Sequence, residues 1–442
     1  MIRSVDAPPT PAEFGFLDRA ARRVVVGRLT GLRRGELRLS DSFATSGGGE
    51  SEESPVTIRV HRPRFYRRLI AGGSTAAADS YLDGDWECDD LTTLFRLFIR
   101  NRDAASSFDR GVARLAGVVH RLGHAMRRNS TSGSKRNIAA HYDLGNDFYR
   151  LWLDETLAYS SGVFLDAEWS LHEASVEKFD RVCRKLDLRP GDRLLEIGTG
   201  WGGFALHAAG VYGCRVTTTT ISDRQHRYAA ERFAADPAGA RIRLLKDDYR
   251  QLRGRFDKLA SIEMIEAVGK NYWDDYFRRC SRLLHSHGTF VLQGIVIADR
   301  YFDEYVRSVD FIQRHVFPGG CLPGIGAIVD AVGRTTDLRP VHLEDFAPHY
   351  AETLRRWRQR FSAALDDVRA LGCSERFIRL WRYYLCYCEA AFEERNVGVV
   401  QMQFDKPDCR RDPLTHCSRA TAGRAAGATL DPNWSAIGES VR

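Results

Sequence analysis

The sequence has no long hydrophobic run. None of its 442 residues belongs to an uninterrupted apolar stretch of about 18 residues, the length that a membrane-spanning helix needs. The first residues, MIRSVDAPPT, lack the apolar middle part of a secretory signal peptide. With 43% hydrophobic residues, the chain can bury one large core and a smaller one. We therefore expect a cytoplasmic protein whose association with the inner face of a membrane is peripheral.

Closely spaced cysteines are nearly absent. The ten cysteines are scattered, and Cys386 and Cys388 are too close in sequence for the usual zinc-binding or redox pair. Scattered cysteines are typical of reduced thiols in a cytosolic protein. The sequence therefore predicts no metal site.

Acidic residues are missing between Arg110 and Arg136, where seven Lys or Arg residues equal the whole formal net charge of +7. Apolar residues recur in this region at the spacing of one helix face: Phe108, Val112, Leu115, Val119, Leu122 and Met126. The segment fits a basic amphipathic helix on anionic lipid, or an ordinary packed helix with a solvated basic face. No nucleic-acid-binding motif accompanies it, and we expect no nucleic acid partner.

Breaks in the pattern divide the chain. From Asn137, helical segments alternate with the short apolar strands RLLEI, CRVTTTT, RIRLLK, DKLASI and TFVLQGIVI, which is typical of a parallel sheet with helices on both faces. Two helices at about 350–370 and 375–394 precede a last strand at 399–404. In the N-terminal part, ELRLS and VTIRVHRP are predicted strands on either side of a loop, DSFATSGGGESEES.

The glycines of LLEIGTGWGGF follow the first of these strands. Gly198, Gly200 and Gly202 precede a helix predicted to begin near Gly203, and glycine lets a backbone turn tightly and approach a ligand closely. The spacing lacks the third glycine of the dinucleotide fingerprint, and no phosphate-loop lysine follows. With Glu196 two residues before the first glycine, the better match is the S-adenosylmethionine site of class I methyltransferases. A purely structural turn is the alternative.

Further stretches carry a resemblance to a known family. NIAAHYDLGNDFYRLWLDETLAYSSGVF, LLEIGTGWGGFA, TTTTISDRQHRYA, SIEMIEAVG, DFIQRHVFPGGCLP, PHYAETLRRWRQRF and YYLCYCEAAF occur in that order. Together they resemble the cyclopropane-fatty-acyl-phospholipid synthase family, including the synthases that act on mycolic acids. The resemblance covers about 135–407, and AAADSYLDGDWECDDLTTLFRLFIRN resembles the end of the family's smaller N-terminal domain.

This resemblance implies the fold and its division into domains. We expect an α/β class I methyltransferase with a Rossmann-like, mostly parallel seven-stranded sheet and a smaller N-terminal α+β domain. The expected parts are an N-terminal lipid-binding or docking domain, a linker, a catalytic domain and a tail predicted to be disordered: 1–126, 127–136, 137–407 and 408–442.

The resemblance also implies the reaction. Such enzymes transfer the methyl carbon of S-adenosylmethionine to the double bond of an unsaturated acyl chain of a membrane phospholipid, and loss of a proton closes a cyclopropane ring. A transient carbocation needs aromatic faces around it. Five aromatic residues lie in matching motifs: Tyr159, Phe164, Trp201, Tyr350 and Phe392.

The family's base is a bound bicarbonate, and the resemblance implies that Glu266 and Tyr350 hold it here. Gln293 stands where many members carry histidine, and Ile295 lies beside it. Ser161 replaces the cysteine of the commoner motif YSCAxF.

Two further residues are predicted to be less important for the chemistry. Glu263 is predicted to be structural. Cys388 matches a family cysteine once thought catalytic, and a buried thiol on a helix face is its predicted role.

The cofactor contacts implied by the resemblance follow the strands of the sheet. They are Tyr159, Ser160, Glu196, Gly198, Gly200, Gly202, Thr220, Ser222, Gln225, Asp248 and Tyr249. The acid that usually ends the second strand and binds the ribose is absent from TTTTIS, so Ser222 and Gln225 would replace it. Taken alone, Ser222 also fits a helix N-cap.

Other functions fit the same sequence. Methyl or methylene branching without ring closure, methylation of a soluble small molecule and an inactive lipid-binding relative are the alternatives. A homodimer is possible, because family members often dimerise.

Overall fold

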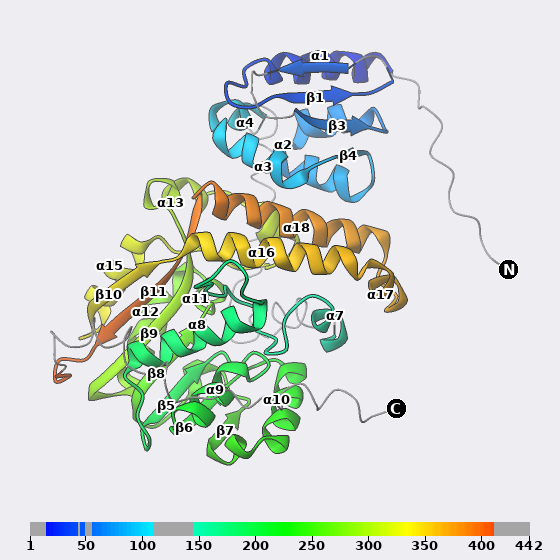
Figure 1. The fold of residues 1–442 in the computed structure, drawn as a ribbon. Helices are drawn as coiled ribbons and strands as arrows, with labels where there is room; N and C mark the ends of the chain where they lie inside the picture. Colours follow the sequence, from blue (N-terminus) through cyan, green and yellow to red (C-terminus); the bar gives the residue numbers. More distant parts are fainter. Residues whose placement is uncertain (1–14, 43–44, 49–54, 109–144, 411–442) are drawn as a thin grey trace.

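The computed structural model describes residues 15–42, 45–48, 55–108 and 145–410. Figure 1 shows three parts in these residues: a small N-terminal unit, a layer of long helices below it, and a large sheet covered by helices. The basic segment 110–136, the predicted linker and most of the predicted tail lie outside the described residues.

The large sheet has seven strands in the order β10-β11-β9-β8-β5-β6-β7. Strand β11 is antiparallel to both neighbours, and the pairs β9-β8, β8-β5, β5-β6 and β6-β7 are parallel. This confirms the predicted class I methyltransferase fold. The strands are β5 (Arg193–Ile197), β6 (Arg215–Thr219), β7 (Ile242–Leu245), β8 (Phe256–Ile262), β9 (Leu284–Ile297), β10 (Arg339–Asp345) and β11 (Val397–Asp405).

Successive residues of the central strands point to opposite faces, as the pleat of a strand requires. Leu194 packs with helices α8, α9 and α10, whereas Leu195 packs with α12 and α15 on the other face. These helices are α8 (Leu171–Leu186), α9 (Gly203–Val211), α10 (Asp223–Ala235), α12 (Trp273–Leu283) and α15 (Ile325–Thr335). Both faces of the sheet are therefore buried, which explains the continuous apolar strands in the sequence.

The N-terminal unit, residues 15–108, is the predicted α+β part. Its sheet has the order β2-β1-β3-β4, and its helices pack around that sheet. The elements are α1 (Phe16–Leu29), β1 (Leu37–Ser40), β2 (Thr45–Gly48), β3 (Val56–Val60), α2 (Arg64–Leu82), β4 (Trp86–Cys88), α3 (Leu91–Arg100) and α4 (Arg102–Phe108). The prediction that 41–54 forms only a loop is wrong, because 45–48 pairs with β1 as an edge strand.

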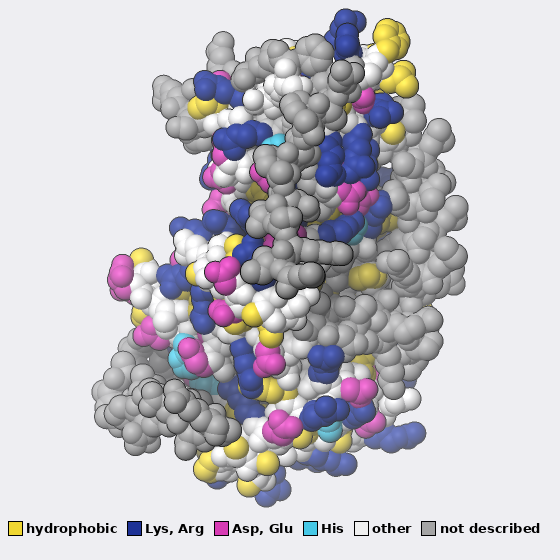
Figure 2. Space-filling view, turned by 90° about the vertical axis from the view of Figure 1, so that its right-hand side faces the viewer, with side chains coloured by type: hydrophobic (Ala, Val, Ile, Leu, Met, Phe, Trp, Pro, Cys, Tyr) yellow, Lys and Arg dark blue, Asp and Glu magenta, His cyan; other side chains and the backbone are white. Residues whose placement is uncertain are grey.

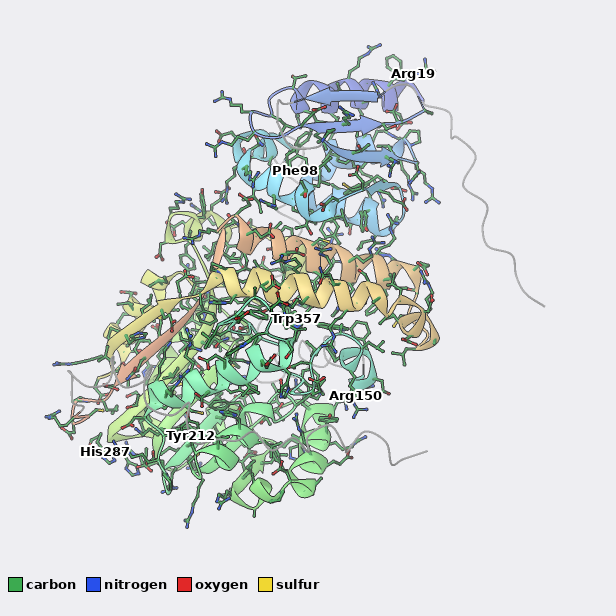
Figure 3. All side chains as sticks on the ribbon, viewed as in Figure 1. Arg19, Phe98, Arg150, Tyr212, His287 and Trp357 are labelled. Carbon is green, nitrogen blue, oxygen red and sulfur yellow. The ribbon has the colours of Figure 1, made fainter. Side chains whose placement is uncertain are left out.

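A helical layer lies between the N-terminal unit and the large sheet (Figure 1). Trp357, labelled in Figure 3, is buried on α16 and contacts the rings of Trp152, Tyr159 and Tyr350. The remaining helices are α7 (Asn146–Arg150), α11 (Ile265–Val268), α13 (Asp299–Tyr305), α14 (Phe311–His315), α16 (Ala347–Ala363), α17 (Leu365–Ala370) and α18 (Glu375–Glu393). Short 3₁₀ turns lie at Pro237–Arg241, Tyr249–Gln251 and Lys270–Tyr272.

Helix α18 joins this layer to the N-terminal unit. The Arg379 guanidinium donates to the carbonyl oxygens of Tyr81 at 2.6 Å and Trp86 at 2.8 Å, and it lies over the Tyr81 ring. Next to it, the Tyr383 ring packs edge-on against Phe95 of α3. Polar and aromatic contacts therefore fix the unit against α18.

The described surface carries charges of both signs. In the face shown in Figure 2, Lys and Arg side chains lie among Asp and Glu side chains. Within the described ranges, no helix is both long and apolar enough to cross a bilayer.

The Arg379 contacts predict a loss of stability when the side chain is shortened. Arg379→Met removes charged donors from two carbonyl groups, so we expect the free energy of unfolding to fall by about 1–3 kcal/mol. Arg376 is a matched control on the same helix, because its side chain is exposed and lies 3.5 Å from Asp83. Arg376→Met should cost less than about 0.5 kcal/mol. Urea unfolding of the full chain measures both, and equal losses would contradict this account.

Candidate active site

The glycine turn lies between β5 and α9, at the carboxyl end of the parallel strands. Gly198, Gly200 and Gly202 have φ values of 105°, 53° and 88°, a region that favours glycine. The N–H groups of Gly198 and Thr199 both donate to the Thr219 carbonyl at 3.1 Å, which ties the turn to β6. The predicted helix start at Gly203 is confirmed.

The glycines of this turn have different neighbours. A Cβ on Gly200 would meet no protein atom within 4 Å, whereas a Cβ on Gly202 would lie 2.5 Å from the Phe233 ring. Gly200 therefore borders open space, and Gly202 allows α10 to pack closely.

That open space is a cavity of about 980 Å³. Its wall includes most of the residues predicted to contact the cofactor: Tyr159, Ser160, Glu196, Gly198, Gly200, Thr220, Gln225, Asp248 and Tyr249. The backbone beside Gly200 leaves room for a ligand, so these residues fit S-adenosylmethionine. The same cavity extends to the N-terminal unit, where Gly72, Ser74 and Thr75 of α2 line it.

Two residues of the predicted set do not line this cavity. Gly202 packs under Phe233, and its predicted place beside the cofactor stays a prediction. Ser222 is the N-cap of α10 and accepts from the Gln225 N–H at 3.3 Å. Ser222 therefore has the helix-cap role that the sequence analysis gave as an alternative. The Thr220 hydroxyl donates to the Gln225 amide oxygen at 2.9 Å, and both of these residues line the cavity.

Asp248 and Tyr249 follow β7. The Asp248 carboxylate accepts from the Arg250 guanidinium at 2.8 and 2.7 Å. Asp248, Tyr249 and Arg250 all line the cavity, as do Gly198 and Gly200 of the glycine turn.

Lys178 is a buried cation that the sequence reasoning missed. It is fully buried on α8, and its Nζ donates to the Ser160 hydroxyl at 2.6 Å. Burial lowers the pKa of Lys178 to about 8, and the nearby carboxylates of Glu263, Asp154 and Glu196 oppose that shift. A lysine on the apolar face of an amphipathic helix is the signal that could have revealed it.

Glu263 lies at the centre of the residues predicted to hold an anion. Its Oε1 accepts from the Ser161 N–H at 2.9 Å and from the Gln293 amide at 2.8 Å, and its Oε2 accepts from the Tyr350 hydroxyl at 2.7 Å. Ser161 and Gln293 are buried behind it and do not line the cavity. Glu263, which the sequence analysis predicts to be structural, therefore contacts three of the predicted catalytic residues.

Glu266 is close by, with fewer partners. Its Oε1 accepts from the Ile295 N–H at 2.5 Å, and its Oε2 has no hydrogen-bond partner among the described residues. Burial, and then the charge of Glu263, raise the pKa of Glu266 to about 8. Glu266 and Tyr350 both line the cavity, and the Tyr350 hydroxyl donates to Glu263 rather than to Glu266.

Aromatic rings form much of the remaining wall. Of the five predicted rings, Tyr159, Trp201, Tyr350 and Phe392 line the cavity. Phe164 does not, because its ring lies under the Arg356 guanidinium.

The cysteines in the described residues are all free. Cys388 lies on α18 in the cavity wall, and burial raises the pKa of its thiol. The thiol therefore keeps its proton at neutral pH, as expected for a helix-face cysteine.

Within the described residues, Asp154, Glu155 and His172 place possible metal ligands within 4.8 Å of one another. The Asp154 carboxylate already accepts from the Thr156 hydroxyl at 2.7 Å. This group lies outside the cavity wall.

A protein-family model described as mycolic acid cyclopropane synthetase matches residues 129–402. The chain belongs to this family. Tuberculostearic acid methyltransferase UfaA1 of Mycobacterium tuberculosis is 36% identical over 377 residues, covering 83% of this chain and 86% of the relative. The cyclopropane-fatty-acyl-phospholipid synthase of Escherichia coli is 35% identical over 369 residues, covering 83% of this chain and 92% of the relative.

Solved structures agree with this assignment. The cyclopropane synthase MmaA2 from Mycobacterium tuberculosis matches with a TM-score of 0.58 and 29% identity, covering 62% of this chain and 98% of that chain. The mycolic acid cyclopropane synthase CmaA1, complexed with SAH and CTAB, has the same TM-score and coverage at 30% identity. The protein is an S-adenosylmethionine-dependent methyltransferase, which confirms the prediction from the glycine turn.

The two glycines predict separable defects. Gly200→Ala meets no protein atom and should cost about 1–2 kcal/mol of stability for its left-handed backbone, but its methyl group enters the cavity. We expect its affinity for S-adenosylmethionine to fall at least ~10-fold, equivalent to about 1.4 kcal/mol. Gly202→Ala clashes with Phe233, and overpacking should add about 1–3 kcal/mol to the same backbone cost.

Calorimetric titration and urea unfolding measure the two effects. Wild-type affinity in folded Gly200→Ala would show that the cofactor binds elsewhere.

The buried carboxyl group of Glu196 should make the stability of the fold depend on pH. Burial raises its pKa to about 8, and the Thr218 hydrogen bond and the Lys178 charge offset this only in part. The folded protein therefore keeps a proton between about pH 4.5 and 8 that the unfolded chain releases, so rising pH lowers stability across this window. Glu196→Gln should flatten the slope by up to about 1.4 kcal/mol per pH unit.

Urea unfolding of the cofactor-free protein from pH 5 to 7.5 tests this, with Glu231→Gln on the exposed side of α10 as the surface control. An unchanged slope in Glu196→Gln would show that the carboxyl is ionised in the folded protein.

Proposed function

We propose that this enzyme transfers the methyl carbon of S-adenosylmethionine to the double bond of an unsaturated acyl chain of a membrane phospholipid, and that loss of a proton then closes a cyclopropane ring. The observation that carries this proposal is one cavity lined by the glycine turn, by aromatic rings and by the Glu263–Glu266 pair. The cofactor supplies an electrophilic methyl group when bound. The cavity can exclude water from that group and hold an apolar chain against it.

Different residues of the cavity wall would bind the cofactor and stabilise positive charge on the acyl chain. Glu196, Gly198 and Gly200 fit the cofactor side, where a carboxyl group and open backbone can meet its amino and sulfonium groups. Tyr159, Tyr350 and Phe392 offer π faces to positive charge on the acyl chain. Burial and the Glu263 charge raise the pKa of Tyr350, so its hydroxyl remains a donor.

A methyl branch without ring closure is the second candidate. The names of two similar relatives point to different reactions. The Escherichia coli protein is named a cyclopropane-fatty-acyl-phospholipid synthase, whereas UfaA1 is named a tuberculostearic acid methyltransferase. Both outcomes share the methyl transfer and differ in what the resulting carbocation does next.

The predicted bicarbonate fits poorly in this structure. Its expected donors, Ser161, Gln293 and Tyr350, already donate to the carboxylate of Glu263.

Peripheral docking on the membrane is part of the proposal, since a double bond within an acyl chain is reached only at the lipid surface. The predicted role of 110–136 in docking remains a prediction, as do the domain boundaries and the homodimer.

The test uses S-adenosylmethionine labelled with ¹⁴C in its methyl group and vesicles of unsaturated phospholipid. We expect label in the acyl chains of the lipid extract, and none when the vesicles contain only saturated lipid. Proton NMR of the product distinguishes a cyclopropane ring from a methyl or methylene branch. Label confined to the aqueous phase would instead indicate a soluble substrate, and no transfer at all would indicate an inactive relative.

A further inference from the structure

We propose that the carboxylate of Glu263 is the base of this reaction and occupies the place that bicarbonate was expected to fill. This inference rests on the proposed function and assigns its proton acceptor to a residue of the chain itself.

The first support is the set of donors around the carboxylate. The Ser161 N–H comes from the loop before α8, the Gln293 amide from β9 and the Tyr350 hydroxyl from α16, and all three converge on Glu263 within 2.7–2.9 Å. Three hydrogen bonds to one buried carboxylate stabilise its ionised form. A bicarbonate ion needs the same donors for its own oxygens, so the two anions exclude each other.

The second support is the orientation of Gln293. Lys185 Nζ donates to the Gln401 amide oxygen at 2.6 Å, so the Gln401 amide nitrogen faces Gln293 and donates to its oxygen at 2.9 Å. The Gln293 nitrogen must then face Glu263. Lys185, two hydrogen bonds away from Gln293, thus fixes the Gln293 amide nitrogen as a donor to Glu263. Gln293 cannot take a proton itself and is a positioning residue.

The third support is the backbone. Glu263 has φ of 50°, a left-handed conformation that costs a non-glycine residue about 1–2 kcal/mol. Its N–H donates to the Gln293 carbonyl at 2.8 Å, which holds this conformation in place. A side chain kept at a strained position inside a cavity wall indicates function rather than packing.

The electrostatics agree with a base at this position. Burial raises the pKa of Glu263, while its hydrogen bonds and the charge of Lys178 oppose the shift. The net increase makes this carboxylate a stronger base than an exposed one. Glu266 has fewer donors and a pKa of about 8, so it keeps its proton at neutral pH and the pair carries one charge.

The chemical step balances with Glu263 as the proton acceptor. The π electron pair of the alkene forms a bond to the methyl carbon, and the carbon–sulfur bond breaks with its pair on sulfur. Glu263 takes a proton from the new methyl group, and the electrons of that C–H bond close the three-membered ring. The proton remains on Glu263 until the product leaves and water enters.

The experiment compares the full-length wild type with Glu263→Gln and Glu263→Gly in buffer freed of bicarbonate. We expect the wild type to need no added bicarbonate. Glu263→Gln should lose about 10²–10⁴-fold in turnover, the range for a lost general base, with unchanged affinity for S-adenosylmethionine in calorimetric titration. Glu263→Gly removes the strain and the side chain, so added bicarbonate should restore part of its turnover.

A second readout does not depend on turnover. Isotope-edited infrared spectra with ¹³C-bicarbonate should show a bound anion in Glu263→Gly and none in the wild type. Wild-type turnover that requires bicarbonate, or full turnover of folded Glu263→Gln, would overturn the assignment. Failure of the wild type to label any acyl chain would instead overturn the proposed function.

Discussion

The site depends on the hydrogen bonds that the buried carboxylate of Glu263 accepts. Its three donors belong to a loop, to a strand of the large sheet and to a helix of the layer above that sheet. A buried carboxylate is costly unless such donors surround it. The alignment of α16 over the sheet is therefore linked to the electrostatics of the cavity, and a displacement of either part would leave the charge less well satisfied.

Buried charges balance one another around the cavity. The three carboxylates of Glu263, Asp154 and Glu196 favour the charged form of Lys178, and Lys178 favours the charged form of each of them. This mutual support keeps several ionisable groups inside a largely aromatic interior. Lys178 is therefore a cation shared by the carboxyl groups of Glu196, beside the glycine turn, and Glu263.

The sequence was sufficient to predict the sheet, because its strands are buried on both faces and form continuous apolar runs. Strand β10 was missed, since most of its residues are exposed and its sequence, RPVHLED, is polar. Strand β2 was missed because Thr-Ser-Gly-Gly resembles a loop. The site was predicted in its residue types but not in its pairing. Two glutamates three residues apart look alike in sequence, but of the two it is Glu263 that has a left-handed backbone and accepts a hydrogen bond from the Tyr350 hydroxyl.

The N-terminal unit does more than pack against α18, because α2 supplies part of the cavity wall at a kink around Gly73. MmaA2 is covered over 98% of its length by 62% of this chain, and the family model begins at residue 129. In this protein, then, the cavity is lined by two parts of the chain, α2 of the N-terminal unit and the region that the family model matches. Substitutions at Gly72, Ser74 or Thr75 can therefore change the shape of the cavity without altering Glu263 or its three donors.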